Sequence, residues 1–154
     1  MIPKNAVTCD FCNPDTGRII LRDKRAYAML SLWPVSEYHT LIIPERHVES
    51  EAELTSEEVL AISKLKLDVI KLVNEITPRQ DYNFGIDVGA TAGGRIPHIH
   101  YHLIFRKPGD TPAPRGIRSV IPETASYESD DDPRLEWVLE WAQDLRDIAK
   151  APNP

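Results

Sequence analysis

Near position 100 the chain reads His98-Ile99-His100-Tyr101-His102-Leu103-Ile104-Phe105, a run in which histidine alternates with apolar residues. Side chains of a β-strand point alternately to its two faces. A strand over residues 98–105 therefore places three imidazoles on one face, and Ile99, Tyr101 and Leu103 on the other. A single strand histidine is commonly structural, but three at this spacing indicate a functional surface.

The segments around this run predict a domain with both strands and helices. Residues 18–22 and 26–32 are typical of a hairpin, 40–43 of a short buried strand, and 82–88 of another strand. A capping box at Thr55-Ser56-Glu57-Glu58 begins a helix that ends before Pro78. The apolar residues of this helix recur at helical spacing and are expected to cover a sheet: Ile62, Leu65, Val69, Leu72, Val73 and Ile76.

The last third of the chain begins with a segment rich in proline and glycine, up to Ile117. A second helix is expected over 133–149, with Asp132 as its N-cap. Its Trp137 and Trp141 can cover the sheet, line a dimer contact or close over a pocket, and packing within the monomer is the preferred role. We expect a core domain over 1–106, with 107–154 an arm and helix packed on that same domain.

Length and charge narrow the classes of protein. A chain of 154 residues is typical of one domain, and its net charge of −6 opposes sequence-independent binding to a nucleic-acid backbone. No apolar run approaches the roughly 20 residues that cross a bilayer, and the start lacks a signal-peptide core. We expect a cytoplasmic protein without membrane or nucleic-acid polymer partners, able to bind a small anion through local positive charge.

The cysteines, Cys9 and Cys12, form a single Cys-x-x-Cys pair. In an intracellular chain such a pair indicates half of a metal site or a redox motif, and two unremarkable cysteines remain the third alternative. His47 adds an imidazole, and His98 can supply the fourth ligand of a tetrahedral zinc ion. We favour a structural zinc site made by these four residues.

The histidine run itself permits two chemistries. Clustered neutral imidazoles can bind zinc, and one oriented imidazole can attack phosphorus as a nucleophile. If His98 binds a structural zinc, His100 and His102 are free for chemistry. His39 either serves the pocket or hydrogen-bonds a loop backbone. The small-residue loop 89–95 can bring backbone amides close to an anion.

Three segments resemble the histidine-triad (HIT) superfamily: His98 to Ile104, His39 to Val48, and Ala92 to Pro97, with the similarity running from Cys9 to Arg106. The resemblance implies an α+β fold with a five-stranded antiparallel sheet and one long helix packed on it, and a homodimer that binds nucleoside phosphates. It implies that His100 attacks the α-phosphorus to form a nucleotidyl-histidine. His102 and His39 would bind phosphate oxygens and handle leaving-group protons. The zinc ligands of such proteins match Cys9, Cys12, His47 and His98.

Three positions depart from the family pattern. Asp87 stands where an amide side chain usually faces phosphate. Ser31 stands where Asp or Asn usually contacts the ribose. Gly94-Arg95 replaces a Gln that is followed by Ser or Thr. Arg115 and Arg118, in an arm resembling an extension of some bacterial members, can reach a polyphosphate or remain solvated. The candidate substrate-binding residues are Ser31, Leu32, Asp87, Gly93, Gly94, Arg95, Arg115 and Arg118.

These observations favour a nucleotide hydrolase or nucleotidyltransferase that acts at the α-phosphate of a nucleoside polyphosphate, a dinucleoside polyphosphate or a nucleoside phosphoramidate. Two alternatives remain. One is a non-catalytic, zinc-stabilised nucleotide-binding or scaffold protein, for which the departures at Ser31, Asp87 and Gly94-Arg95 argue. The other is a hydrolase with a catalytic zinc on all three histidines of the run.

Overall fold

The computed structural model describes residues 9–77 and 81–110. The predicted helix over 133–149, Arg115 and Arg118 lie outside the described residues, as does most of the arm. The proposed division of the chain at residue 106 therefore stays a prediction.

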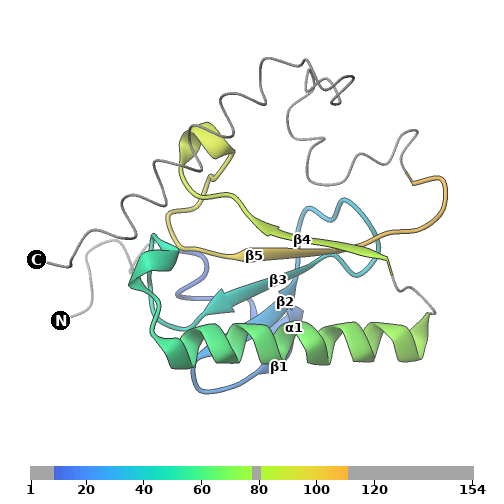
Figure 1. Cartoon of the computed structure of the whole chain (residues 1–154), viewed down its shortest axis with the longest axis horizontal. Helices are drawn as coiled ribbons and strands as arrows, with labels where there is room; N and C mark the ends of the chain where they lie inside the picture. Colours follow the sequence, from blue (N-terminus) through green and yellow to red (C-terminus); the bar gives the residue numbers. More distant parts are fainter. Residues whose placement is uncertain (1–8, 78–80, 111–154) are drawn as a thin grey trace, which may run out of the picture. The chain divides into compact units, whose positions relative to one another are not determined.

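Five strands form one antiparallel sheet in the order β1-β2-β3-β5-β4 (Figure 1). Their bounds are β1 Ile19–Arg22, β2 Ala26–Leu30, β3 Thr40–Pro44, β4 Tyr82–Ile86 and β5 Tyr101–Phe105. Helix α1, Ser56–Ile76, packs on β1, β2 and β3. The loops of the described residues also contain the short 3-10 helices η2 Thr16–Arg18, η3 Glu51–Glu53 and η4 Ala90–Ala92. This arrangement confirms the expected α+β fold with a five-stranded antiparallel sheet.

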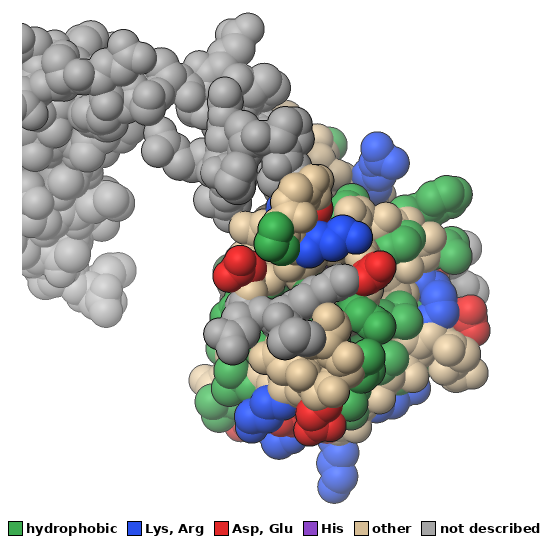
Figure 2. Space-filling view, turned by 90° about the vertical axis from the view of Figure 1, so that its right-hand side faces the viewer, with side chains coloured by type: hydrophobic (Ala, Val, Ile, Leu, Met, Phe, Trp, Pro, Cys, Tyr) green, Lys and Arg blue, Asp and Glu red, His purple; other side chains and the backbone are tan. Residues whose placement is uncertain are grey.

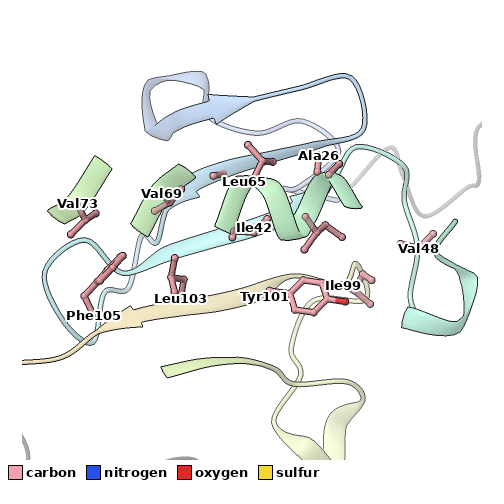
Figure 3. Packing of buried hydrophobic residues seen from close by; sticks show 13 residues of the cluster. Ala26, Ile42, Val48, Leu65, Val69, Val73, Ile99, Tyr101, Leu103 and Phe105 are labelled. Atoms are coloured by element: carbon pink, nitrogen blue, oxygen red, sulfur yellow. The ribbon is translucent and has the colours of Figure 1, made fainter. Parts of the chain in front are cut away.

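The core between α1 and the sheet follows the predicted alternation along the histidine run. Ile99, Tyr101, Leu103 and Phe105 all belong to this core (Figure 3). The helix contributes Ala61, Ile62, Leu65, Val69 and Val73. Two residues assigned to the helix stripe are not buried: Leu72 is 37% exposed and Ile76 62% exposed, because both lie beside the row formed by Leu65, Val69 and Val73.

Four strands are shorter than predicted, and β1 differs only in beginning at Ile19 rather than residue 18. β2 ends at Leu30 rather than residue 32, and β4 ends at Ile86 rather than residue 88. β5 begins at Tyr101 rather than His98, because the facing Pro44 has no amide hydrogen for the ladder and its carbonyl accepts a hydrogen bond from His98 Nε2. The amide of Ile99 instead donates to Val48 O at 2.8 Å.

A second, smaller apolar cluster includes the opposite side chains of β2 and β3. Tyr27 and Met29 meet Leu41 and Ile43 there, together with Cys9 and Phe11 from the loop before β1. The loop that carries both cysteines is thereby packed against the sheet. No helix within 9–77 or 81–110 has the length and apolarity needed to cross a bilayer.

The start of α1 is fixed by a buried carboxylate. Thr55 and Glu58 form the predicted capping box, and Arg46 donates two hydrogen bonds to the Glu58 carboxylate, at 3.0 and 2.9 Å. The hydrogen bond from Arg46, followed by that from the Thr55 amide, lowers the pKa of Glu58 to about 2 although burial opposes the shift. Arg46 also donates to Glu53 O, which ties the segment before His47 to the helix start.

Replacement of Glu58 by glutamine is expected to lower the free energy of unfolding at pH 7 by about 1–2 kcal/mol, because Arg46 loses its charged acceptor. The folded-state pKa lies below the unfolded value of about 4.3. The stabilisation by Glu58 is therefore fully present above that value and is lost as the pH falls toward 2. Denaturant titrations of both proteins from pH 6 to pH 2 should show the difference shrinking. The matched control is Asp68→Asn in the exposed Lys64–Asp68 pair, which should leave stability unchanged; a pH-independent difference at Glu58 would contradict the prediction.

Candidate functional site

The structure gathers all five histidines of the chain into one row of rings. The ring centroids of His47 and His98 lie 4.8 Å apart, those of His100 and His102 5.1 Å, and those of His102 and His39 5.2 Å. Loops and strands far apart in sequence supply them: the loop before β3, the loop after it, and the run leading into β5. One end of the row adjoins the cysteines, and the other ends at His39.

The cysteine end of the row has the geometry of a metal site. Nδ1 of His98 lies 3.5 Å from Cys9 Sγ and 3.7 Å from Cys12 Sγ, and Nδ1 of His47 lies 3.2 Å from Cys12 Sγ. In tetrahedral zinc, with Zn–S of about 2.3 Å and Zn–N of about 2.0 Å, sulfur and nitrogen ligands are separated by about 3.5 Å. The four ligand atoms lie within 4.8 Å of one another, so these residues fit a zinc ion.

The remaining nitrogens of the two metal-site histidines also suit this role. His98 Nε2 lies 3.0 Å from Pro44 O, so it carries the hydrogen and leaves Nδ1 as the free lone pair. Burial lowers the pKa of His98 to about 4, which keeps the ring neutral. His47 Nε2 is buried without a hydrogen-bond partner but lies 3.5 Å from Glu49 Oε1, the kind of carboxylate that orients metal-bound imidazoles.

At the other end of the row, a hydrogen bond with a defined donor and acceptor joins His39 and His102. The Val35 amide donates to His39 Nδ1 at 3.3 Å, so the hydrogen of the neutral His39 ring is on Nε2. That nitrogen lies 3.0 Å from His102 Nδ1 and donates to it, which places the His102 hydrogen on its own Nε2. Burial, and then the charge of His102, lowers the pKa of His39 to about 4; burial and the charge of His100 lower the pKa of His102, while Asp87 raises it.

His100, between the two ends of the row, has one ring nitrogen in a hydrogen bond and one with a free lone pair. Its Nδ1 lies 2.9 Å from His98 O and donates to that carbonyl. The lone pair of the neutral ring is therefore on Nε2. His100 is 9% exposed, so most of its surface contacts other parts of the protein. Within the described residues the only group suited to a metal contains the cysteines, and it does not include His100 or His102.

The other predicted substrate-binding residues differ in their exposure and in the hydrogen bonds that they already make. The Ser31 hydroxyl accepts from the Trp33 amide, and Leu32 is 62% exposed. Asp87 and Arg95 are exposed. The amides of Gly93 and Gly94 donate to Ala90 O and Gly89 O inside their own loop. The expected use of these two amides for phosphate therefore requires the loop to open.

Position 94 requires glycine because the surrounding backbone leaves no space for a side chain, and not because of its backbone conformation. A Cβ at this position would lie 2.6 Å from Asp87 O and 3.0 Å from Gly89 N. A glutamine, or any other side chain, cannot be accommodated here without displacing the backbone that follows β4. Gly93, by contrast, has open space around it but a φ of +94°, the left-handed region that favours glycine.

Gly94→Ala is therefore expected to destabilise the protein by about 1–3 kcal/mol through overpacking. Gly93→Ala, the matched control, meets nothing within 4 Å and should cost only the roughly 1 kcal/mol of a left-handed alanine. Thermal unfolding of the two variants checks this order. Equal effects would show that the loop moves away from Asp87 at no cost.

Several supporting groups were missed from the sequence. Phe11 packs against His98 and His100, Pro44 O accepts from His98, and the Val35 amide fixes the tautomer of His39. Only Phe11 carried a usable signal, as an apolar residue between the two cysteines of a predicted metal site. Backbone groups at specific positions have no signature in side-chain sequence.

The fold and the site define an α+β protein with a histidine row beside a Cys2His2 cluster, and comparison with known proteins agrees. The HIT domain family model matches residues 14–109. The chain therefore belongs to the HIT family.

Relatives and solved structures extend this comparison. AP-4-A phosphorylase of Mycobacterium tuberculosis is 28% identical over 132 residues, which cover 84% of this chain and 65% of that protein. The asymmetrical bis(5'-nucleosyl)-tetraphosphatase of Schizosaccharomyces pombe is 31% identical over 97 residues, covering 63% of this chain and 53% of that protein. This chain thus spans less than two thirds of the length of either relative. A HIT family protein from Bacillus anthracis has the same fold, with a TM-score of 0.71 at 23% identity, over 95% of this chain and 98% of that one.

Proposed function

We propose that this protein is a nucleotide hydrolase or nucleotidyltransferase that cleaves at the α-phosphate of a nucleoside polyphosphate, a dinucleoside polyphosphate or a nucleoside phosphoramidate. The observation that carries the proposal is the arrangement of His100, whose Nδ1 donates to His98 O and whose Nε2 holds the lone pair. Neutral imidazole is a competent nucleophile toward phosphorus. The names of the relatives, which refer to AP-4-A and bis-nucleosyl tetraphosphate, support this substrate class.

In the first step the Nε2 lone pair of His100 forms a bond to the α-phosphorus, and the bond from phosphorus to the leaving group breaks with its electron pair. The ring becomes positively charged, and its Nδ1–H remains donated to His98 O, which stabilises that charge. In the second step water or another acceptor attacks phosphorus. The N–P bond then breaks, its electron pair returns to Nε2, and the proton of the acceptor passes to solvent.

His102 acts in this mechanism as a hydrogen-bond donor to a phosphate oxygen. Its Nδ1 accepts from His39, so the hydrogen on Nε2 is directed away from His39. Burial lowers the pKa of His102, which favours the neutral form of its ring over the protonated form. A phosphate leaving group spreads its negative charge over its own oxygens and departs without a proton, whereas the amine leaving group of a phosphoramidate departs with a proton taken from solvent. His39 therefore serves by orienting His102.

Cys9, Cys12, His47 and His98 would hold a structural zinc ion, which would fix the segment that ends in His100. The metal supplies no reactive group in this scheme, because all four ligand positions are filled by protein. Arg95, exposed beside the loop after β4, would supply positive charge for the phosphates, and Ser31 and Leu32 would contact the nucleoside.

A homodimer and a cytoplasmic location complete the proposal. β4 is an edge strand of the described sheet, which leaves one side available for pairing with a second copy. Figure 2 shows a face on which basic and acidic side chains are interspersed with hydrophobic ones, without a continuous basic stripe. The net charge of −6 also argues against a nucleic-acid polymer as partner. Sedimentation velocity at micromolar concentration measures the oligomeric state.

The mass of the intact protein, measured after brief incubation with nucleotides, tests the covalent mechanism. Adenosine polyphosphates, dinucleoside polyphosphates and an adenosine phosphoramidate form the panel. A transient mass increase equal to one nucleoside monophosphate less water, together with released product, is expected. Nucleotide binding without adduct or product across the panel would overturn the proposal and favour the binding-protein alternative.

Asp87→Asn is expected to lower KM for anionic substrates about fivefold, equivalent to roughly 1 kcal/mol of removed charge repulsion. The reason is that the Asp87 carboxylate follows β4 beside the histidines and acts electrostatically on His102. Steady-state kinetics at low and high salt measure the effect, which should shrink as salt screens the charge. An unchanged KM at low salt would show that Asp87 does not face the substrate.

A further inference from the structure

The loop that carries the two cysteines also carries an aromatic ring into the histidine row. Phe11 lies between Cys9 and Cys12, and a tight turn closes around it, with the Cys12 amide donating to Cys9 O at 3.0 Å. Its side chain is 6% exposed and belongs to the cluster with Tyr27, Met29, Leu41 and Ile43. Phe11 is therefore fixed on the same face of the sheet as the nucleophile.

The Phe11 ring contacts two histidines with different roles. Its centroid lies 4.9 Å from that of His100 at an interplanar angle of 63°, and 5.9 Å from that of His98 at 76°. Both are edge-to-face contacts, the favourable geometry for aromatic pairs. One ring thus joins a metal-binding imidazole to the reactive imidazole.

The backbone of Phe11 is held as firmly as its ring. Tyr27, which is fully buried in β2, donates its hydroxyl to Phe11 O at 2.6 Å. The cysteines on either side would be anchored by the metal, so three attachments define where the ring stands. None of them involves the substrate.

The ring of His100 needs such a support. Its hydrogen bond to His98 O restrains Nδ1. The tilt of the ring, which sets the direction of Nε2, depends in addition on the side chains that pack against it. His102 packs on His100 at 5.1 Å, and Phe11 packs on it at 4.9 Å. Loss of the Phe11 ring would therefore remove one of the two ring contacts that hold the His100 imidazole.

We propose that Phe11 is a positioning residue, through which the metal-binding loop sets the orientation of the His100 imidazole. The metal site then serves the reaction as well as stability, because order in the segment from Cys9 to Cys12 is transmitted to the nucleophile by the Phe11 ring. The inference rests on the proposed function only in taking His100 as the nucleophile. The orientation of the His100 ring can be measured without any substrate.

The test compares Phe11→Leu with Phe84→Leu in the full zinc-loaded chain. Phe84 makes a stacked aromatic contact with Tyr101 at 5.4 Å and packs against the other cluster, between α1 and the sheet. In Phe11→Leu we expect unchanged zinc content, shifted or broadened imidazole NMR signals of His100, and a kcat about tenfold lower with KM within about twofold. In Phe84→Leu the His100 signals and kcat should match wild type.

Tyr27→Phe supplies a second variant in case Phe11→Leu loses zinc or unfolds. It removes only the hydroxyl that holds Phe11 O, and it should shift the His100 signals in the same direction by a smaller amount. Wild-type His100 signals in Phe11→Leu would overturn the inference, as would equal losses in Phe11→Leu and Phe84→Leu. If Phe11→Leu does not fold, unshifted signals in Tyr27→Phe would overturn it. A wild-type protein without turnover would refute the proposed function, while the NMR comparison would still decide the role of Phe11.

Discussion

Replacement of His100 by alanine is expected to reduce turnover of the nucleotide panel by about 10⁴-fold or more, because it removes the proposed nucleophile. The adduct seen by mass spectrometry should disappear with it. Folding should survive, since His100 makes one hydrogen bond, to His98 O, and contributes little to the apolar core. Steady-state kinetics and thermal unfolding of the same sample separate the two effects.

The matched control for this variant is His39→Ala, which removes a histidine from the far end of the row. His39 contacts His102 and does not carry the attacking nitrogen. Adduct formation should therefore persist in His39→Ala at a reduced rate. Substantial turnover by His100→Ala would exclude the covalent mechanism.

Loss of the metal should produce the second large effect, on stability. A ligand held at about 1,000 times its dissociation constant stabilises the folded state by about 4 kcal/mol. For a chain of this size that corresponds to a fall in Tm of about 10 °C on chelation. Differential scanning calorimetry with and without a chelator, beside a measured zinc stoichiometry, checks the value.

A Cys9→Ser, Cys12→Ser double variant is the control for chelation. It should have the lower Tm from the start and show no further change with chelator. Two alternatives give different results: a redox pair predicts loss of two hydrogens from the intact mass on oxidation, and unremarkable cysteines predict no zinc and no effect of chelator. A catalytic zinc on the three histidines of the run predicts loss of activity without any change at the cysteines.

Patterns confined to one element were read correctly from the sequence. The alternation predicted from His98 to Phe105 is kept although β5 begins only at Tyr101, and Ile99, Tyr101 and Leu103 belong to the core cluster beneath α1. The capping box at Thr55 satisfies local backbone groups, so it identifies the start of α1 without knowledge of the rest of the chain.

Features that depend on the meeting of distant segments were harder to predict. β5 is shorter than the pattern indicates because of Pro44, a residue more than fifty positions away that faces it across the sheet. The proximity of Cys9, Cys12, His47 and His98 was a hypothesis from residue types, and only the fold brings their ligand atoms together. The need for glycine at position 94 arises from the Asp87 carbonyl, which no local pattern reveals.

The alternation along the histidine run also limits how this protein can change. His98 belongs to the cluster that could hold a metal, His100 is the proposed nucleophile, and Ile99, Tyr101 and Leu103, which alternate with the histidines, fill the core beneath α1. Deleting or inserting one residue within the run from His98 to Phe105 would exchange the two faces for the residues on one side of the change. Imidazoles would then be buried under the helix and Tyr101 would stand in the row, so metal binding, chemistry and core packing would fail together. Length variation should therefore be tolerated in the loop before residue 97 only where the strand register is kept, whereas point substitutions can alter one property at a time.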